Sequence, residues 1–547
     1  MTRRRWWGPR RRRLPVAVAT LLFVALAAVA AVLATDEDAR EGVPALADSR
    51  ATEEAPSDGT ADDGTADDGT AGDGAESDEP GDTARREGAG DNGAASSPAE
   101  GQEPSEHAKP APPRELPTHL VDHLEGLLAQ DDLAEVEELS VVVLDDRGHE
   151  VAGHEPDTPV VPASTKKLVT AAAGWRLLGP DFRYSTRIVA TGAIEDGVLD
   201  GDLVVVGSGD PTLASEPYRD EVHPQRAHTP VEPLVEAVTE AGVTEVRGSI
   251  RGDPHRFADE PRADGWADRY FWTLNTTYAS GLTIDAGRAL RERDDRLVGE
   301  AAEDPAVTVA EVVTDLLDEA GVDVHGEPAR AEEPATGREL GRVTSPPLSE
   351  LLQAVVQDSD NHMSDAVFRT LGAAVGDPTW AGSAAAARAA LDDDGLDWEG
   401  TALPDGSGLS RQARLPARLL AELDRVMTLE EGEEWRELLA VAGESGTLRR
   451  RLVDTPAAGA LFGKTGALRD VRSLAGHVDG PGDLRWHVAI LGSGLDGPGL
   501  TAVRELHDDL VLTLADPPDC PPADHPGTCD PPEDEDDEGD DEGDDEG

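Results

Sequence analysis

Long stretches near both ends of the chain contain too few apolar residues to form a core, and this limits where a fold can lie. Residues 36–113 are acidic and low in complexity, and the run from Asp58 to Gly74 repeats Gly-Thr-Ala-Asp-Asp. Residues 516–547 are rich in Pro, Asp, Glu and Gly. Such segments cannot bury enough apolar surface to offset the entropy lost on folding. We therefore expect a disordered acidic linker at 36–113, a disordered acidic tail at 516–547, and a folded part between them.

The N-terminus indicates export from the cytoplasm. Seven arginines precede an apolar run from Leu14 to Ala34. Basic residues before an apolar run of membrane-spanning length indicate a cytoplasmic start and an exported remainder. Two interpretations of residues 1–35 stay open: an uncleaved membrane anchor, which we favour, and a signal peptide cut after Ala34. Both place the folded part outside the cytoplasm, either anchored to the cell membrane or secreted to the cell wall.

Charge and cysteine content exclude some classes of protein. The chain has 112 acidic residues and 48 basic ones, and its net charge is −64. Because nucleic-acid binding requires a basic face, we expect no nucleic acid as a partner. The two cysteines, Cys520 and Cys529, both lie in the tail, which excludes a disulfide framework in the folded part. Whether the two cysteines pair stays open.

Hydrophobic periodicity predicts helices and strands between residues 114 and 515. Helices are expected at 117–130, 164–178, 307–320, 348–356 and 500–514, and strands at 139–144, 184–190, 202–206, 246–251, 471–478 and 484–491. The last two strands are joined by a Gly-Pro-Gly turn and should form a hairpin. Hairpin-paired strands with helices elsewhere predict an α+β fold, in which an antiparallel sheet is flanked by helices.

The first motif that suggests chemistry is Pro162-Ala-Ser-Thr-Lys-Lys-Leu168, at the start of an expected helix. Residues three apart share a helix face, so Lys167 can reach the hydroxyl of Ser164, whereas Lys166 should point away. A serine becomes a nucleophile when a base takes its proton, and a lysine can be that base when its pKa is lowered. Taken alone, this spacing is more often a helix-capping serine followed by exposed lysines.

The second motif is Gln357-Asp-Ser-Asp-Asn361, between two expected helices. The hydroxyl of Ser359 can relay a proton, and the amide of Asn361 can bind a substrate carbonyl and hold the lysine. The alternative is a polar turn between helices.

The third motif is Gly463-Lys-Thr-Gly466. A phosphate-binding loop is the competing interpretation, but such a loop must open a helix, and a strand pattern follows here. On an edge strand, Lys464 and Thr465 would lie beside a bound peptide. The backbone N–H of Ala467, the residue after Gly466, could then bind an oxyanion.

Together and in this order, the three motifs are the signature of penicillin-binding proteins and class A β-lactamases. The sequence resembles the D-Ala-D-Ala carboxypeptidase/endopeptidase family of low-molecular-mass penicillin-binding proteins that carry a large insert between the first two motifs. The resemblance spans roughly residues 116–515 and includes Gly207–Leu213, Asp405–Arg411 and Gly446–Leu448.

The resemblance implies an α/β penicillin-binding, transpeptidase-like domain in two parts, residues 114–190 and 341–515. An inserted, mainly β domain would occupy residues 191–340. The implied activity is that of a serine-type D-alanyl-D-alanine carboxypeptidase that hydrolyses peptidoglycan stem peptides through an acyl-enzyme and is inhibited by penicillins and other β-lactams. Endopeptidase cleavage of cross-links stays open as a second activity. The family chemistry needs no metal and no organic cofactor.

The resemblance also assigns roles to the motif residues. Ser164 is the expected nucleophile, Lys167 its base, and Ser359, steered by Lys464, the group that passes a proton to the leaving amine. The full expected set is catalytic Ser164, Lys167, Ser359, Asn361 and Lys464, with Thr465, Gly466 and Ala467 binding substrate. The family often has Thr where this chain has Ala467, so a hydroxyl that would help to bind the substrate carboxylate is absent.

Two alternatives to the carboxypeptidase remain. One is a β-lactamase or esterase on the same scaffold, but the chain has no Asn between Asn361 and Lys464, where a class A β-lactamase needs one for deacylation. The other is an inactive cell-wall binding protein, against which the intact motifs argue. The role of the insert and the oligomeric state stay open.

N-terminal sequencing of the mature protein tests the favoured interpretation of residues 1–35. We expect the arginines that precede Leu14 to be retained, because an uncleaved anchor keeps its basic start on the cytoplasmic side. A mature chain that starts at Thr35 would contradict the anchor and indicate secretion.

Overall fold

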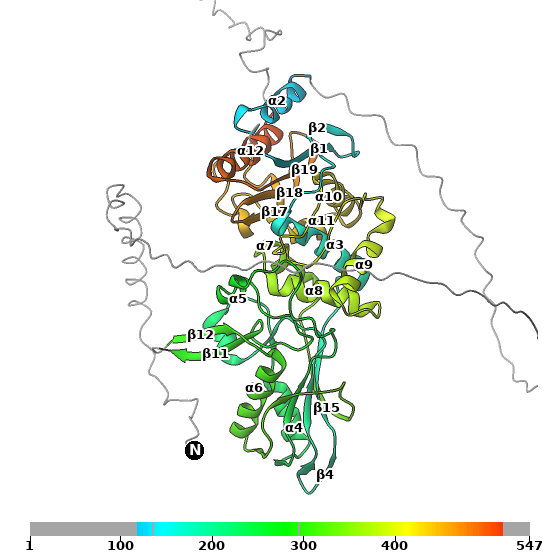
Figure 1. Ribbon diagram of the computed structural model, residues 1–547, viewed down its shortest axis with the longest axis vertical. Helices are drawn as coiled ribbons and strands as arrows, with labels where there is room; N and C mark the ends of the chain where they lie inside the picture. Colours follow the sequence, from blue (N-terminus) through cyan, green and yellow to red (C-terminus); the bar gives the residue numbers. More distant parts are fainter. Residues whose placement is uncertain (1–117, 134–135, 294–295, 518–547) are drawn as a thin grey trace, which may run out of the picture. The chain divides into compact units, whose positions relative to one another are not determined.

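The computed structural model describes residues 118–133, 136–293 and 296–517 (Figure 1). The expected anchor and linker, nearly all of the expected tail and both cysteines lie outside these residues. None of the helices within the described ranges is both long enough and apolar enough to cross a bilayer.

Strands from the two ends of the described chain pair in one six-stranded sheet, with the order β16-β17-β18-β19-β1-β2. The strands are β1 (Glu138–Asp145), β2 (Glu150–His154), β16 (Ala440–Val441), β17 (Leu461–Leu468), β18 (Val471–Asp479) and β19 (Arg485–Ser493). All five neighbouring pairs are antiparallel, and β18 and β19 form the expected hairpin. The expected antiparallel sheet is therefore confirmed.

Alternate residues of the central strands enter two separate cores. In β1, Val142 and Leu144 join the first core, whereas Val141 and Val143 join the second, because successive side chains point to opposite faces of a sheet. The first core is shared with α3 (Lys167–Leu178), α7 (Leu348–Gln357), α8 (Asn361–Ala374), α9 (Trp380–Ala390), α10 (Ala417–Glu431) and α11 (Glu433–Leu438), and the second with α2 (Thr118–Leu128) and α12 (Gly497–Ala515). Burial on both faces explains why residues 139–144 are almost continuously apolar.

A second set of strands lies between β2 and α7 in the sequence, and we call residues 185–344 the second lobe. It contains a five-stranded sheet, β14-β10-β6-β3-β15, and a four-stranded sheet, β13-β9-β5-β4. The strands of these sheets are β3 (Ser185–Ala190), β4 (Ala193–Glu195), β5 (Val198–Asp200), β6 (Leu203–Val206), β9 (Glu245–Val246), β10 (Ile250–Asp253), β13 (Asp323–Val324), β14 (Ala329–Arg330) and β15 (Arg338–Thr344). Helices α4 (Glu232–Glu240) and α6 (Pro305–Glu319) pack against these sheets around a third core.

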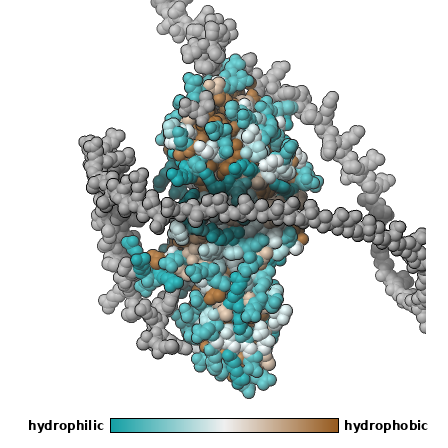
Figure 2. All heavy atoms as spheres, in the orientation of Figure 1, coloured by the Kyte–Doolittle hydropathy of each residue, from teal (hydrophilic) through white to brown (hydrophobic). Residues whose placement is uncertain are grey.

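Short elements complete the second lobe. They include a π-helical turn (Tyr218–Val222) and α5 (Arg269–Trp272), whose Tyr270 and Phe271 pack in the first core. Two small sheets are formed by β7 (Leu213–Ala214) with β8 (Thr229–Pro230) and by β11 (Arg288–Arg293) with β12 (Arg296–Ala301). The visible face over α4, α6 and β15 is largely hydrophilic (Figure 2), which agrees with the acidic composition of the chain.

The domain limits expected from the sequence stay a prediction, but strand pairing shows where the second sheet begins and ends. β3 pairs with both β6 and β15. The sheet therefore starts at Ser185 and ends at Thr344. It extends beyond the expected insert at both ends, because β3 and β15 pair with each other in this sheet.

The single strand expected at 246–251 is wrong. The structure divides this run into β9 and β10, which belong to different sheets. Gly248 lies between them, and a Cβ there would come within 2.2 Å of Asp202 Oδ1. The chain bends at this glycine because it passes directly against residues 201–202.

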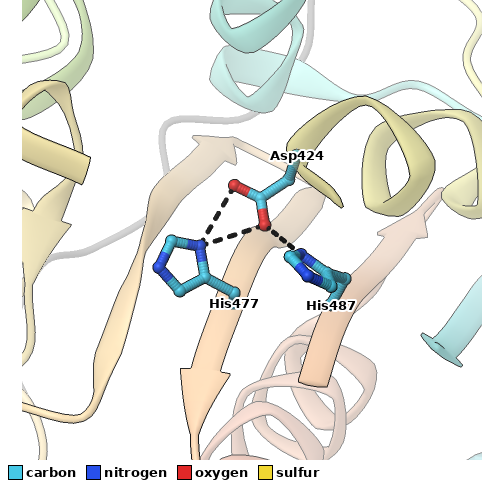
Figure 3. Close-up of side chains that lie close together, drawn as sticks. All are labelled: Asp424, His477 and His487. Carbon is cyan, nitrogen blue, oxygen red and sulfur yellow. Dashed lines mark hydrogen bonds and ion pairs between the residues drawn. The ribbon is translucent and has the colours of Figure 1, made fainter. Parts of the chain in front are cut away.

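A polar trio lies inside the first core, between α10 and the sheet (Figure 3). Asp424 Oδ2 accepts hydrogen bonds from Nδ1 of His487 at 2.7 Å and of His477 at 3.1 Å, and Oδ1 accepts one from Trp435 Nε1 at 3.1 Å. Burial acts to raise the pKa of Asp424, but the two histidines outweigh it and hold that pKa well below the ordinary value. A buried carboxylate is tolerated when it is paired and hydrogen-bonded in this way.

Replacing this carboxylate should destabilise the fold. Asp424→Ala leaves three buried N–H donors without an acceptor, so we expect the free energy of unfolding to fall by roughly 3–5 kcal/mol, measured by urea unfolding. Asp122→Ala, which removes an exposed carboxylate on α2, is the control and should change it by less than about 0.5 kcal/mol. Equal unfolding midpoints for the two variants would contradict the assignment.

Candidate active site

Ser164 lies in a 3-10 turn, η3 (Ala163–Lys166), that leads directly into α3. The helix expected from residue 164 therefore begins with a tighter turn. Side chains three residues apart eclipse each other in such a turn, and Lys167 Nζ lies 3.1 Å from Ser164 Oγ. Ser164 is half-buried, while every other residue from Val160 to Trp175 is buried. The hydroxyl is thus the accessible group of an otherwise enclosed segment.

The backbone of this turn is held in an unusual conformation. Ala163 has a φ of 48°, in the left-handed region that side-chain-bearing residues rarely occupy. The preceding carbonyl, that of Pro162, accepts hydrogen bonds from Thr165 Oγ1 at 2.7 Å and from Ser473 Oγ on β18 at 2.6 Å. Such strain persists only where surrounding contacts fix it, so β18 helps to hold the turn that carries Ser164.

Lys167 makes three hydrogen bonds, and their chemistry determines what its amine can do. Nζ lies 2.7 Å from Asn361 Oδ1 and 2.7 Å from the carbonyl oxygen of Ser407, in addition to Ser164 Oγ. Carbonyl oxygens only accept, so in the neutral amine both N–H groups must point to Asn361 and Ser407. The remaining lone pair then points toward Ser164 Oγ, as a base that takes its proton requires.

The surroundings of Lys167 also make its neutral form accessible. Burial lowers the pKa of Lys167 to about 8, although the charges of Asp365, Asp405 and Asp360 act to raise it. Burial disfavours the charged form of an amine. The neutral amine is therefore more accessible near neutral pH than in an exposed lysine.

Residues 405–410 form a backbone scaffold that holds the Ser407 carbonyl against Lys167. Asp405 accepts hydrogen bonds from the N–H groups of Gly408 at 3.0 Å and Ser410 at 2.7 Å. Gly408 has a φ of 78°, and a Cβ there would lie 1.9 Å from the oxygen of Ala163. This glycine is needed because the scaffold passes directly against the turn that carries Ser164.

Asp365 anchors the same scaffold from α8. Its Oδ1 accepts from the N–H of Gly406 at 2.8 Å and of Ser407 at 2.9 Å. Burial and then the charge of Asp405 raise the pKa of Asp365. Sequence reasoning assigned no role to Asp365 or to residues 405–410. The signals that point to them are the Asp-Gly-Ser-Gly stretch and the position of Asp365 one turn after Asn361.

The second motif lies at the start of α8. Ser359 follows α7 and has a φ of 61°, and Asp360 caps α8 by accepting a hydrogen bond from Met363 N at 2.8 Å. The amide of Asn361 faces two ways: Oδ1 accepts from Lys167, and Nδ2 donates to the carbonyl of Asn275 at 2.7 Å. Both contacts require the same orientation of the amide.

The third motif lies on β17, which is an edge strand at this point. β16 pairs with Phe462 and Gly463, so among the described residues no strand pairs with the outer side of β17 from Lys464 onward, and β17 is an edge strand there, as expected. Lys464 is buried, and its Nζ donates to the carbonyl of Thr465 at 2.7 Å. Burial and the charge of Lys167 lower the pKa of Lys464 well below its ordinary value.

Gly466 brings β17 against the nucleophile. A Cβ at Gly466 would lie 2.1 Å from Ser473 Oγ and 2.9 Å from Ser164 N, so this contact excludes any side chain. Ala467 follows it and is exposed on the strand. Thr465 is oriented by a 2.8 Å hydrogen bond to Thr447.

The structure thus joins Ser164, Lys167 and Asn361 through direct hydrogen bonds and packs Gly466 beside them. The hydrogen bonds of Lys464 and Thr465 go to other groups, so their contact with substrate stays a prediction. The proton relay from Ser359 to the leaving amine also stays a prediction.

Lys166, the other lysine of this turn, lies in the first core. Its side chain is fully buried, and Nζ lies 4.3 Å from the centre of the Phe368 ring and has no hydrogen-bond partner among the described residues. The side chain does turn away from Ser164, but it enters the first core, because the turn is covered by α8.

Asp424, His477 and His487 are of a type that binds metal ions, and their ligand atoms lie within 4.8 Å of one another. However, the Nδ1 atoms that would face a metal already serve the carboxylate as hydrogen-bond donors. The hydrogen-bond network accounts for this trio.

Comparison with known proteins agrees with this geometry. The chain is 33% identical over 342 residues to carboxypeptidase Rv3627c of Mycobacterium tuberculosis, covering 60% of this chain and 70% of that protein. It is 28% identical over 480 residues to the D-alanyl-D-alanine carboxypeptidase of Actinomadura sp. (strain R39), covering 73% and 85%. Penicillin binding protein 4 (dacB) from Haemophilus influenzae has the same fold, with a TM-score of 0.61 and 20% identity over 72% of this chain and 99% of that one. A second structure of that protein, with a TM-score of 0.57, is complexed with a β-lactam.

The sequence also matches the D-Ala-D-Ala carboxypeptidase 3 (S13) family over residues 120–302 and 291–512, segments that together contain all three motifs. A serine-type member of that family requires a serine held against a lysine. This chain holds Ser164 against the buried Lys167, in a fold that it shares with a penicillin-binding protein. The chain belongs to the D-Ala-D-Ala carboxypeptidase 3 (S13) family.

Proposed function

We propose that Ser164 is the nucleophile with which this carboxypeptidase cleaves the bond between two D-alanines of a peptidoglycan stem peptide. Neutral Lys167 takes the proton of Ser164 as Oγ attacks the carbonyl carbon. The terminal D-alanine leaves, an ester to Ser164 remains, and water hydrolyses it. The observation that carries this proposal is the pair of carbonyl oxygens, those of Asn361 and Ser407, that direct the lone pair of Lys167 toward Ser164.

The remaining motif residues have roles around this reaction. The backbone N–H groups of Ser164 and Ala467 bind the developing oxyanion, an effect of about 3 kcal/mol for each donor. Lys464 and Thr465 bind the terminal carboxylate of the substrate, and Ser359 passes a proton to the leaving amine. The Haemophilus relative, which shares this fold, is complexed with a β-lactam, and this supports β-lactam binding by this chain.

We also propose that the reaction takes place outside the cytoplasm. The support is the arginine-rich start followed by the apolar run from Leu14 to Ala34, together with a substrate that belongs to the cell wall. An acidic linker repels itself and extends, which would let an anchored enzyme reach the wall.

Ser164→Ala should abolish both acylation by penicillin and release of D-alanine, because it removes the hydroxyl that Lys167 Nζ contacts at 3.1 Å. Intact-mass measurement after incubation with penicillin detects the adduct. Mass spectrometry of purified muropeptides detects loss of terminal D-alanine and cleavage of cross-links in one experiment. A persistent adduct on the variant would show that the nucleophile is another residue, and rapid turnover of penicillin by the wild type would indicate a β-lactamase.

The rate of acylation should depend on pH through Lys167. Because burial lowers the pKa of Lys167 to about 8, the second-order acylation constant should rise with pH up to that value as the amine loses its proton. Lys167→Ala should lower the constant roughly 10²- to 10⁴-fold. It should also remove the rise of the constant with pH, which is the acidic limb of the pH–rate profile.

Lys166→Met is the matched control for Lys167. It keeps an apolar stem against Phe368 and removes the other buried amine of the same turn, so the acidic limb should remain. A limb that survives in Lys167→Ala and disappears in Lys166→Met would mean that the base has been assigned to the wrong lysine.

A further inference from the structure

Three consecutive residues at the start of α8 are each bound by the second lobe. Asp360 forms an ion pair with Arg226, Asn361 Nδ2 donates to the carbonyl of Asn275 at 2.7 Å, and His362 Nδ1 lies 2.8 Å from Thr277 Oγ1. The partners come from two separate segments, one before α4 and one after α5. The second lobe therefore makes direct contacts that hold the second motif in place.

The ion pair lies next to a strained residue. Ser359 has a φ of 61°, a conformation that persists in a serine only where neighbouring contacts fix it. Asp360 follows it and uses both carboxylate oxygens: Oδ1 accepts from Met363 N at 2.8 Å to cap α8, and Oδ2 pairs with Arg226. Arg226 thus fixes the residue between Ser359 and Asn361.

The same ion pair affects the charge around the base. Besides burial, which lowers the pKa of Lys167, Asp360 is among the carboxylates that raise it. A guanidinium beside Asp360 compensates part of that negative charge. The charged and titratable groups that face these residues lie around Lys167 (Asp365, Asp405, Lys166 and Lys464), beside Asp360 (His362 and His223), beside His362 (Arg288) and beside Arg226 (Tyr218, His223 and Asp358).

We propose that Arg226 is a positioning residue of the acylation reaction. Through Asp360 it keeps Ser359 and Asn361 in their reactive places, and it balances the negative charge next to Lys167. The inference rests on the proposed acylation of Ser164, and it gives the second lobe a part in assembling the active site.

Arg226→Met tests this, with Arg219→Met as the matched control. Arg219 belongs to the same lobe and pairs with Glu232, and its side chain is 24% exposed against 26% for Arg226. The second-order constant for acylation by labelled penicillin is measured across the pH range, with the melting temperature of each variant. Arg226→Met should react roughly 10- to 100-fold more slowly at neutral pH. Its acidic limb should move to higher pH, because uncompensated Asp360 stabilises the Lys167 ammonium. Arg219→Met should match the wild type.

Arg226→Lys separates charge from geometry. It should return the limb to its wild-type position while recovering only part of the rate, because an ammonium cannot reproduce the planar hydrogen-bonding of a guanidinium. If Arg226→Met does not fold, Arg226→Gln takes its place with the same expectations.

Two results would overturn the inference. One is an Arg226→Met variant with wild-type rate and wild-type limb. The other is an equal loss of rate in Arg226→Met and Arg219→Met with no movement of the limb, which would indicate a purely structural role. A wild-type protein that penicillin does not acylate would instead contradict the proposed function.

Discussion

The hydrogen bonds of Lys167 impose the main constraint on this fold, because they join three separate segments of the chain at one buried amine, whereas the buried amine of Lys166 lies over the ring of Phe368. The partners of Lys167 are Ser164 in its own turn, Asn361, 194 residues further along the chain, and Ser407, 240 residues further along. A buried amine without partners would cost several kcal/mol. The fold must therefore bring the start of α8 and the 405–410 scaffold to the start of α3. That requirement also produces the geometry in which the lone pair of neutral Lys167 faces Ser164.

The close approach of these segments explains which residues surround Ser164. Gly408 and Gly466 lie against the turn where a Cβ would collide with Ala163 or Ser164. Ala163 and Ser359 adopt left-handed backbone conformations that are unfavourable on their own. Strain of this kind is stored at sites whose geometry is fixed before substrate arrives, and it is maintained here by β18, residues 405–410 and the second lobe.

Two buried aspartates show how environment sets the charge of one residue type. Asp424 faces two imidazoles, which lower its pKa despite burial. Asp365 lies near a second carboxylate, Asp405, and burial together with that charge raises its pKa. The first aspartate stabilises the packing of α10 on the sheet, and the second holds the scaffold beside Lys167. The opposite pKa shifts of these two aspartates cannot be read from composition, because each shift depends on which charges lie within a few ångströms.

The sequence by itself determined the elements and contacts that depend on neighbours along the chain. The three-residue spacing of Ser164 and Lys167, the apolar run at 139–144 and the hairpin near the C-terminus are local patterns, and local periodicity is set by backbone geometry. Tertiary structure alone decided the burial of Lys166, the scaffold role of Asp365, the division of residues 246–251 between two sheets and the ion pair of Arg226 with Asp360. Each of these features either joins residues far apart in the chain or depends on which element packs over a side chain. Such contacts are fixed by tertiary packing and not by local periodicity.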